Sequence, residues 1–137
     1  MHMIDLEQLQ ELSTAKSYSK NTIIIREKDK EPYCMYIILQ GNVRIVKNYG
    51  AVDQVLITQL GPGDFFGEMS LFLLKPRAAT VITSSEETVV LEINQMNAYS
   101  IIENNSELLY KIVKTLCERI DYLNGKVPPR YGQGMLT

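Results

Sequence analysis

Two side chains of opposite charge, Glu68 and Arg77, lie in the segment Phe65–Thr83 (FFGEMSLFLLKPRAATVIT), which is otherwise poor in charge. A guanidinium presents its N–H donors in a planar fork that suits the oxygens of a phosphate. A carboxylate only accepts hydrogen bonds, so it suits a hydroxyl of a ligand. The pair therefore indicates a ligand that carries both a phosphate and a hydroxyl, as a nucleotide does.

The residues around this pair favour a close approach between a ligand and the backbone. Gly67 has no Cβ and permits such an approach. Met69–Leu73 is predicted to form a short helical turn, whose free N–H groups favour an anion. Pro76 restricts the backbone at the arginine, and the small side chains of Ala78 and Ala79 leave room for a ligand.

A purely structural explanation stays open for the same residues. An ion pair between Glu68 and Arg77 that only stabilises the fold fits the residue types about as well as a ligand site does. The run Gly61-Pro62-Gly63 is in the same way an ordinary signal for a turn.

The elements that would position these residues are mostly short strands. Apolar spacing in Ile4–Leu12 predicts an amphipathic N-terminal helix, followed by a polar joint, Ser13–Asn21. The β-branched and apolar runs that predict strands are Thr22–Ile25, Met35–Leu39, Val43–Lys47, Val55–Leu60, Ala79–Thr83 and Thr88–Ile93. The turn at Gly41 predicts a hairpin between the second and third of these runs. Short strands at this spacing favour an antiparallel sandwich, barrel or jelly roll.

The pattern becomes helical after Asn94. Gln95–Ile102 is predicted as a short helix and Ser106–Asn124 as a longer one, with Gly125 as its C-cap and residues 125–137 as a tail. The apolar stripe of the longer helix consists of Leu109, Ile112, Val113, Leu116, Ile120 and Leu123. This stripe suits packing on the strands, and it equally suits a dimer seam of barely two heptads. We expect one α+β domain, mainly β, over residues 1–137.

The composition excludes several classes of protein. The chain has 137 residues, of which 45% are hydrophobic and 22% charged, and these are the proportions of one soluble domain with its own core. A net charge of −2 argues against a binder of nucleic acids or anionic membranes. The single histidine is His2, and no cluster of metal ligands or Walker-type loop is present in the sequence. We therefore expect no enzyme activity, no metal and no cofactor.

The cysteines and the apolar runs indicate the cellular compartment of the protein. Cys34 and Cys117 stand alone at apolar-patterned positions, which predicts buried free thiols in a reducing compartment. No apolar run approaches the ~20 residues that span a bilayer, and the N-terminus lacks the pattern of a signal peptide. We therefore expect a cytoplasmic protein that makes no contact with a membrane.

The segment with Glu68 and Arg77 resembles the phosphate-binding cassette of the cyclic-nucleotide-binding domain family. The family pattern is matched in identity and spacing by Phe66–Leu71 (FGEMSL) and Pro76–Val81 (PRAATV). Met35–Val43 (MYIILQGNV) and Leu60–Phe66 (LGPGDFF) also resemble the family, so the resemblance covers nearly the whole chain. It implies an antiparallel jelly roll with a short N-terminal helix and two C-terminal helices.

The same resemblance implies roles for individual residues. Glu68 would accept the ribose 2′-hydroxyl, and Arg77 would bind the exocyclic oxygens of a cyclic phosphate. The backbone N–H groups of Ser70 and Ala79 would complete the cradle, and Ala78, where a hydroxyl residue favours cGMP, makes cAMP the expected ligand. The ligand-binding residues so implied are Gly67, Glu68, Met69, Ser70, Arg77, Ala78 and Ala79; contacts to the base or lid fall to Phe66, Lys114 and Tyr122. The chain departs from the family pattern at Lys28, where glycine is usual, in a turn that we expect to lie away from the cassette.

The resemblance also implies how binding is reported. The ligand would shift the helices in 95–124, and the helix in 106–124 would act as a lid or form a homodimer that signals to an effector protein. Only 13 residues follow Asn124, too few for a helix-turn-helix, so we expect no DNA binding by this chain. The alternatives are the sensing half of a catabolite-activator-like transcription regulator without its DNA-binding domain, and a jelly-roll module for another small effector.

Overall fold

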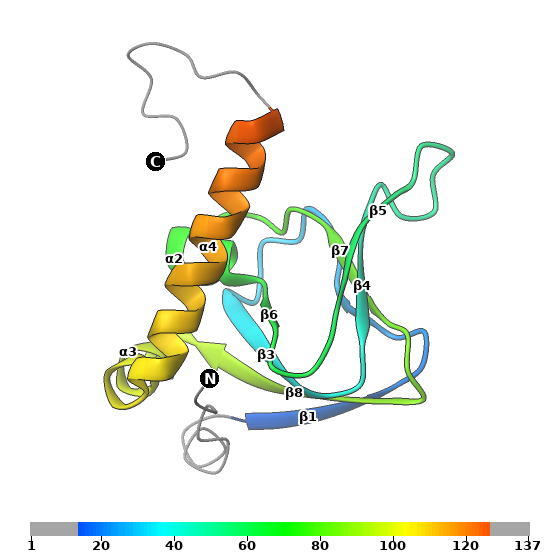
Figure 1. Ribbon diagram of the computed structural model, residues 1–137. Helices are drawn as coiled ribbons and strands as arrows, with labels where there is room; N and C mark the ends of the chain where they lie inside the picture. Colours follow the sequence, from blue (N-terminus) through cyan, green and yellow to red (C-terminus); the bar gives the residue numbers. More distant parts are fainter. Residues whose placement is uncertain (1–13, 127–137) are drawn as a thin grey trace. The chain divides into compact units, whose positions relative to one another are not determined.

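The computed structural model describes residues 14–126, which form two antiparallel sheets and three helices (Figure 1). The strands are β1 (Thr14–Ser19), β2 (Ile23–Ile25), β3 (Cys34–Gln40), β4 (Val43–Lys47), β5 (Val55–Leu60), β6 (Phe65–Phe66), β7 (Thr80–Thr83) and β8 (Glu87–Asn94); the helices are α2 (Glu68–Leu73), α3 (Gln95–Asn104) and α4 (Ser106–Lys126). Within the described part, residues 14–101 and 102–126 form separate compact units.

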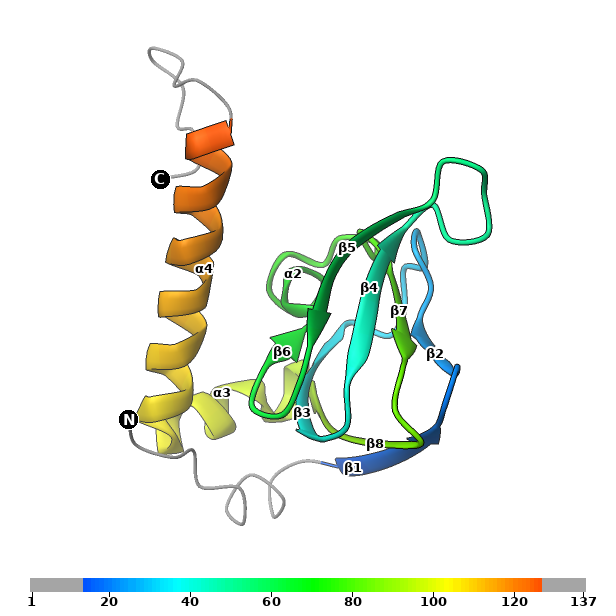
Figure 2. The ribbon, with the colours of Figure 1, turned by 45° about the vertical axis from the view of Figure 1, so that its right-hand side comes forward.

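The first unit is a jelly roll, which confirms the expected fold class. One sheet has the strand order β1-β8-β3-β6 and the other β2-β7-β4-β5, and every pair is antiparallel. Figure 2 shows β4, β5 and β7 of the second sheet side by side. The core consists of buried residues from strands of both sheets: Ile25, Cys34, Tyr36, Ile38, Val43, Phe66, Val81 and Val90. Burial of these side chains is the main source of stability for such a fold.

The predicted hairpin between the strands on either side of Gly41 is wrong. β3 pairs with β8 and β6, whereas β4 pairs with β5 and β7, so the turn carries the chain from one sheet to the other. Gly41 has a φ of 81°, and a Cβ there would lie 2.5 Å from the carbonyl oxygen of Glu87. The corner therefore requires glycine both for its conformation and for its close approach to β8.

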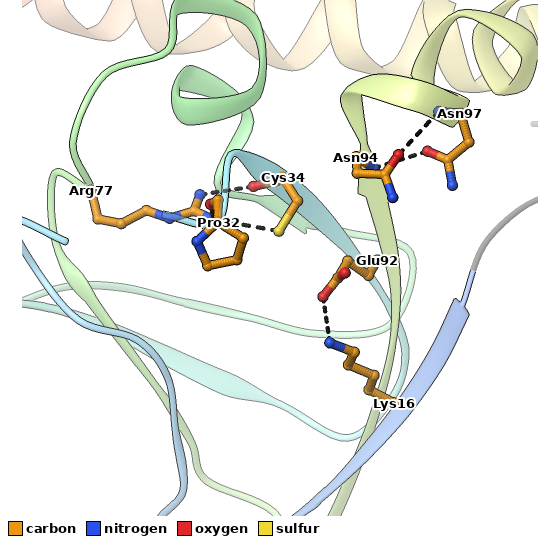
Figure 3. Close-up of polar contacts among 7 residues, drawn as sticks. All are labelled: Lys16, Pro32, Cys34, Arg77, Glu92, Asn94 and Asn97. Atoms are coloured by element: carbon orange, nitrogen blue, oxygen red, sulfur yellow. Dashed lines mark hydrogen bonds and ion pairs between the residues drawn. The ribbon is translucent and has the colours of Figure 1, made fainter. Parts of the chain in front are cut away.

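The segment expected as a polar joint contains a strand, β1. It pairs with β8 from Thr14 opposite Glu92 to Ser19 opposite Glu87. Most β1 side chains are exposed, so the strand has no apolar alternation that would reveal it in the sequence. Lys16 contributes an ion pair of 2.7 Å to Glu92 on β8 (Figure 3). The predicted helix in Ile4–Leu12 lies outside the described residues.

The helices agree with the pattern in the second half of the chain. α3 begins at a reciprocal pair of hydrogen bonds, in which the side-chain oxygens of Asn94 and Asn97 each accept from the other's backbone N–H at 3.1 and 2.9 Å (Figure 3). Such a reciprocal cap satisfies donors at the helix start. α4 continues through Gly125 to Lys126, beyond the predicted C-cap. Cys34 is a buried free thiol as expected, but Cys117 is exposed, as are Leu109 and Val113 of the apolar stripe of α4.

Tyr36→Phe is expected to reduce the loss of stability at high pH. Burial raises the pKa of the Tyr36 phenol above its ordinary value of 10.0, and the neighbouring Cys34 thiol is the next cause. Unfolding restores the ordinary pKa of the phenol. The contribution of protonated Tyr36 to the free energy of unfolding is therefore constant below about pH 10 and falls by about 1.4 kcal/mol per pH unit above it. Urea titrations of both proteins from about pH 8 to pH 11 measure this difference. Parallel pH profiles of the two proteins would contradict the assignment.

Candidate ligand site around the segment 65–83

The first half of the site is a strand followed by a one-and-a-half-turn helix. Buried β6 leads into Gly67, which precedes α2 and has a φ of 83°. This left-handed conformation favours glycine, and a Cβ on Gly67 would lie 2.8 Å from Nη1 of Arg77. Glu68 is the first residue of α2 and is buried. The sequence thus places the carboxylate directly after a glycine whose backbone lies close to the arginine side chain.

The helix α2 ends almost at once, and Ser70 holds its end. The backbone N–H of Leu74, which has a φ of 56°, donates to the carbonyl of Ser70 at 3.0 Å. The Ser70 hydroxyl donates to the carbonyl of Lys75 at 2.8 Å and is buried. These bonds fix the path of the chain between the predicted helical turn and Pro76.

Arg77 is 4% exposed, and its guanidinium donates to four protein acceptors, of which Figure 3 draws those on Pro32 and Cys34. Nη1 donates to the carbonyl oxygens of Cys34 at 2.8 Å and Gly67 at 3.1 Å. Nη2 donates to the carbonyl of Pro32 at 2.5 Å and to the Sγ of Cys34 at 3.5 Å. None of these acceptors is a carboxylate. These hydrogen bonds fix the plane of the guanidinium, but none of the acceptors carries a negative charge that would offset its positive charge.

The turn that contains Lys28 contacts Arg77 directly, which corrects the expectation that it lies away from the cassette. The backbone N–H of Lys28 donates to the Arg77 carbonyl, and the N–H of Arg77 donates to the Asp29 carbonyl, both at 2.8 Å. Lys28 has a φ of 78°, the conformation for which the family uses glycine. The segment 28–34 therefore holds both the backbone and the side chain of the arginine.

Lys28→Gly is expected to raise the free energy of unfolding by about 0.5–1 kcal/mol, because glycine adopts the left-handed conformation without strain. Lys30→Gly, in the same loop but without a positive φ, is the matched control and is expected to destabilise slightly. Urea denaturation of the two variants measures the difference. Equal destabilisation by both substitutions would show that Lys28 is not strained.

The structure brings most of the predicted site residues together in the unit 14–101. The residues placed there are Phe66, Gly67, Glu68, Met69, Ser70, Arg77, Ala78 and Ala79. Met69 and Ala78 are exposed, and Ala79 is half-buried. Lys114 and Tyr122 lie on α4 in the other unit, so their contact with the ligand stays a prediction.

Phe66 has a place in the core rather than on a surface. Its ring is buried and stacks on Tyr36, with ring centroids 5.1 Å apart. Aromatic stacking of this kind stabilises a core beyond its burial alone. The predicted contact between Phe66 and the base or lid stays a prediction.

Several groups at the site were not foreseen in the sequence. They are the carbonyls of Pro32 and Cys34, the thiol of Cys34, the turn at Lys28 and Asp29, and Lys47, which donates to the Ala78 carbonyl at 2.8 Å. Backbone carbonyls leave no trace in residue types, so no local signal could have found them. The departure from glycine at Lys28 is visible in the sequence, but the contact of this turn with Arg77 is not.

Neither a metal-binding cluster nor a membrane-spanning helix is found among residues 14–126. That part of the chain contains no group of three or more His, Cys, Asp or Glu side chains arranged to hold a metal ion. Among its helices, none combines the length and the apolar character needed to cross a membrane.

Known proteins are similar to this chain in sequence over most of its length. Residues 15–105 match the family model described as "Cyclic nucleotide-binding domain". The "cGMP-dependent 3',5'-cGMP phosphodiesterase A" of Dictyostelium discoideum is 32% identical over 78% of this chain and 11% of its own length. The "CRP-like cAMP-activated global transcriptional regulator" of Mycobacterium tuberculosis is 29% identical over 68% and 41%, respectively. The chain thus spans well under half of each relative, and one of the two is an enzyme.

Solved structures share the fold. The catabolite activator protein of Thermus thermophilus superposes with a TM-score of 0.76 at 20% identity, over 88% of this chain and 56% of that one. The regulatory domain of the Toxoplasma gondii PKA with cAMP superposes with a TM-score of 0.62 at 21% identity, over 79% and 41%. These likenesses show that the chain shares the fold of the two solved structures. Because the family model matches residues 15–105, this chain belongs to the cyclic nucleotide-binding domain family.

Proposed function

We propose that the domain binds a 3′,5′-cyclic purine nucleotide, cAMP in preference to cGMP, and regulates the output of other protein segments. The observation that carries this proposal is the buried guanidinium of Arg77, whose four protein acceptors include no carboxylate. A buried cation with neutral partners is stabilised when an anion enters its surroundings. The phosphate of a cyclic nucleotide is such an anion, and its oxygens accept charge-assisted hydrogen bonds from a guanidinium.

The contacts of Nη2 suggest where the phosphate would bind. Its thiol contact to Cys34 is long, at 3.5 Å, and sulfur is a weak acceptor. A phosphate oxygen that replaced this sulfur would form a charge-assisted hydrogen bond, roughly twice as strong as a neutral one. The Nη1 contacts to Cys34 and Gly67 would remain and keep the fork in position.

Glu68 and Ala78 support the assignment of the sugar and the base. Glu68 is buried in the first turn of α2, one residue after the glycine that approaches Arg77, and would accept a hydrogen bond from the ribose 2′-hydroxyl. Ala78 has no hydroxyl to offer a guanine base, which favours cAMP. The M. tuberculosis relative is described as cAMP-activated and the D. discoideum relative as cGMP-dependent, so cGMP is the second candidate.

The output would come from the helices in 95–124. Ligand binding would shift the equilibrium between two arrangements of α3 and α4. The size of this shift is set by the difference in the ligand's affinity for the two arrangements. Lys114 and Tyr122 on α4 would then contact the base, and the helix would form a homodimer or bind an effector protein. Relatives that include a transcription regulator and a phosphodiesterase favour a regulatory module that is combined with different outputs. In our proposal the module itself is neither an enzyme nor a nucleic-acid binder and acts in the cytoplasm.

Isothermal titration of the wild-type protein with cAMP, cGMP, a cyclic dinucleotide and 5′-AMP tests this function. We expect one site per chain for cAMP, weaker binding of cGMP, and little binding of 5′-AMP, whose phosphate is not held in a ring. Absence of heat with both cyclic nucleotides would overturn the proposal. Binding of a cyclic dinucleotide in their place would favour a jelly-roll module for another effector.

A further inference from the structure

The thiol of Cys34 contacts the guanidinium on which the proposed site depends. Cys34 is buried at the start of β3, and its Sγ accepts from Nη2 of Arg77 at 3.5 Å (Figure 3). Nη2 also donates to the carbonyl of Pro32, and Nη1 donates to the carbonyls of Cys34 and Gly67. Because Nη1 and Nη2 carry four N–H groups, these four acceptors occupy all of them. A phosphate oxygen that takes a full hydrogen bond from Nη1 or Nη2 must therefore displace one of the four.

The thiol is the acceptor that a phosphate displaces at the lowest cost. Its contact is the longest of the four, and sulfur is a weak acceptor. A buried carbonyl that lost its donor would instead carry the penalty of an unpaired polar group. The thiol also has a second polar neighbour, since hydrogen bonding between Cys34 and the phenol of Tyr36 is, after burial, the largest cause that raises the pKa of Tyr36. The loss of Nη2 therefore leaves the thiol with a partner.

The strength of the displaced contact enters the affinity of the site directly. The free energy of binding is the difference between the bound and the ligand-free protein, so an interaction made only in the ligand-free protein opposes binding. A stronger acceptor at position 34 would hold Nη2 more firmly and weaken binding. A side chain without an acceptor would leave Nη2 available and strengthen binding.

We propose that the side chain at position 34 sets the affinity of the phosphate site, because the Cys34 thiol is a weak acceptor that occupies Nη2 of Arg77 until a phosphate oxygen replaces it. This inference rests on the proposed binding of a cyclic nucleotide. It adds to the site a side chain from β3, outside the segment 65–83. Cys34 acts through Arg77 and is therefore a positioning residue.

Two substitutions of Cys34 are expected to change the affinity for cAMP in opposite directions. Cys34→Ala removes the acceptor, and we expect the affinity to rise about twofold to fivefold, the effect of one weak hydrogen bond. Cys34→Asn provides an amide oxygen one bond further from the backbone than Sγ, within ordinary reach of Nη2. We expect this variant to bind about tenfold more weakly than the wild type, the effect of a hydrogen bond to a charged group. Isothermal titration measures both changes.

The opposite signs separate this role from a structural one. If Cys34 only filled the core, both substitutions would disturb the packing and neither would raise the affinity. Urea denaturation checks that both variants are folded, and side-chain ¹⁵N–¹H NMR of the ligand-free proteins should show the Arg77 Nη signals shifted in Cys34→Asn. Cys117→Ala and Cys117→Asn are the matched controls, because this cysteine is exposed on α4, and they should leave the affinity unchanged.

The outcomes distinguish this inference from the proposed function. An unchanged or lower affinity in a folded Cys34→Ala protein, or wild-type affinity in a folded Cys34→Asn protein, would overturn the role of Cys34 alone. Absence of wild-type binding to any cyclic nucleotide would overturn the proposed function, and the role of Cys34 with it.

Discussion

Arg77→Lys is expected to lower the affinity for cAMP at least about a hundredfold, because a lysine retains the charge but loses the planar fork. The fork of Arg77 is fixed by the carbonyls of Cys34, Gly67 and Pro32, so its directions are set before a ligand arrives. A lysine ammonium has three donors, enough to bind these carbonyls but too few to bind a phosphate as well. Isothermal titration measures the loss.

The same contacts make Arg77→Ala a poorer test. Our expectation from the sequence is that this truncation abolishes binding and leaves the domain folded. The structure adds a cost in stability, because the buried carbonyl of Cys34 loses a donor, at about 1–3 kcal/mol for a group left unpaired. Lysine is therefore the substitution of choice, with urea denaturation as the check on folding. A folded Arg77→Lys protein with wild-type affinity would contradict the assignment.

Glu68→Gln is expected to lower the affinity for cAMP about tenfold to a hundredfold and to leave the affinity for 2′-deoxy-cAMP nearly unchanged. The reason is that a hydrogen bond to a charged acceptor contributes about 1.5–3 kcal/mol, and only the ribose hydroxyl makes it. Titration of both proteins with both nucleotides forms a double-mutant cycle, which isolates this one contact.

The matched control is Glu92→Gln, which removes a carboxylate that pairs with Lys16 on β1. It should have no effect on either nucleotide. If Glu68→Gln weakened cAMP and 2′-deoxy-cAMP by the same factor, Glu68 would act on the fold of the segment and not on the ribose.

The cassette could be located in the sequence because its residues are close together along the chain. Phe66–Leu71 and Pro76–Val81 carry both the chemistry and the turns that shape it. The strands were found for the same reason, since local alternation and β-branching report burial. β1 was missed because its side chains are mostly exposed, and nothing but its pairing with β8 makes it a strand.

The errors concern contacts between distant segments. The chain at Gly41 crosses between sheets because β3 and β4 each pair with other strands. The residues of β3 and β4 alone do not show which strands they pair with. The turn at Lys28 was placed away from the site, although its backbone bonds to Arg77. Nothing in the sequence distinguishes Lys47 from other lysines, and only the pairing of β4 with β7 brings it to Ala78.

The central claim is that the buried guanidinium of Arg77 exchanges a neutral acceptor for the phosphate of a cyclic nucleotide. Side-chain ¹⁵N–¹H NMR of the arginines, with the Arg77 signals assigned from the Arg77→Lys spectrum, observes this group directly. We predict that cAMP shifts the Arg77 Nη signals and saturates them at the stoichiometry of the calorimetric titration. Unchanged Arg77 signals in a protein saturated with cAMP would contradict the account.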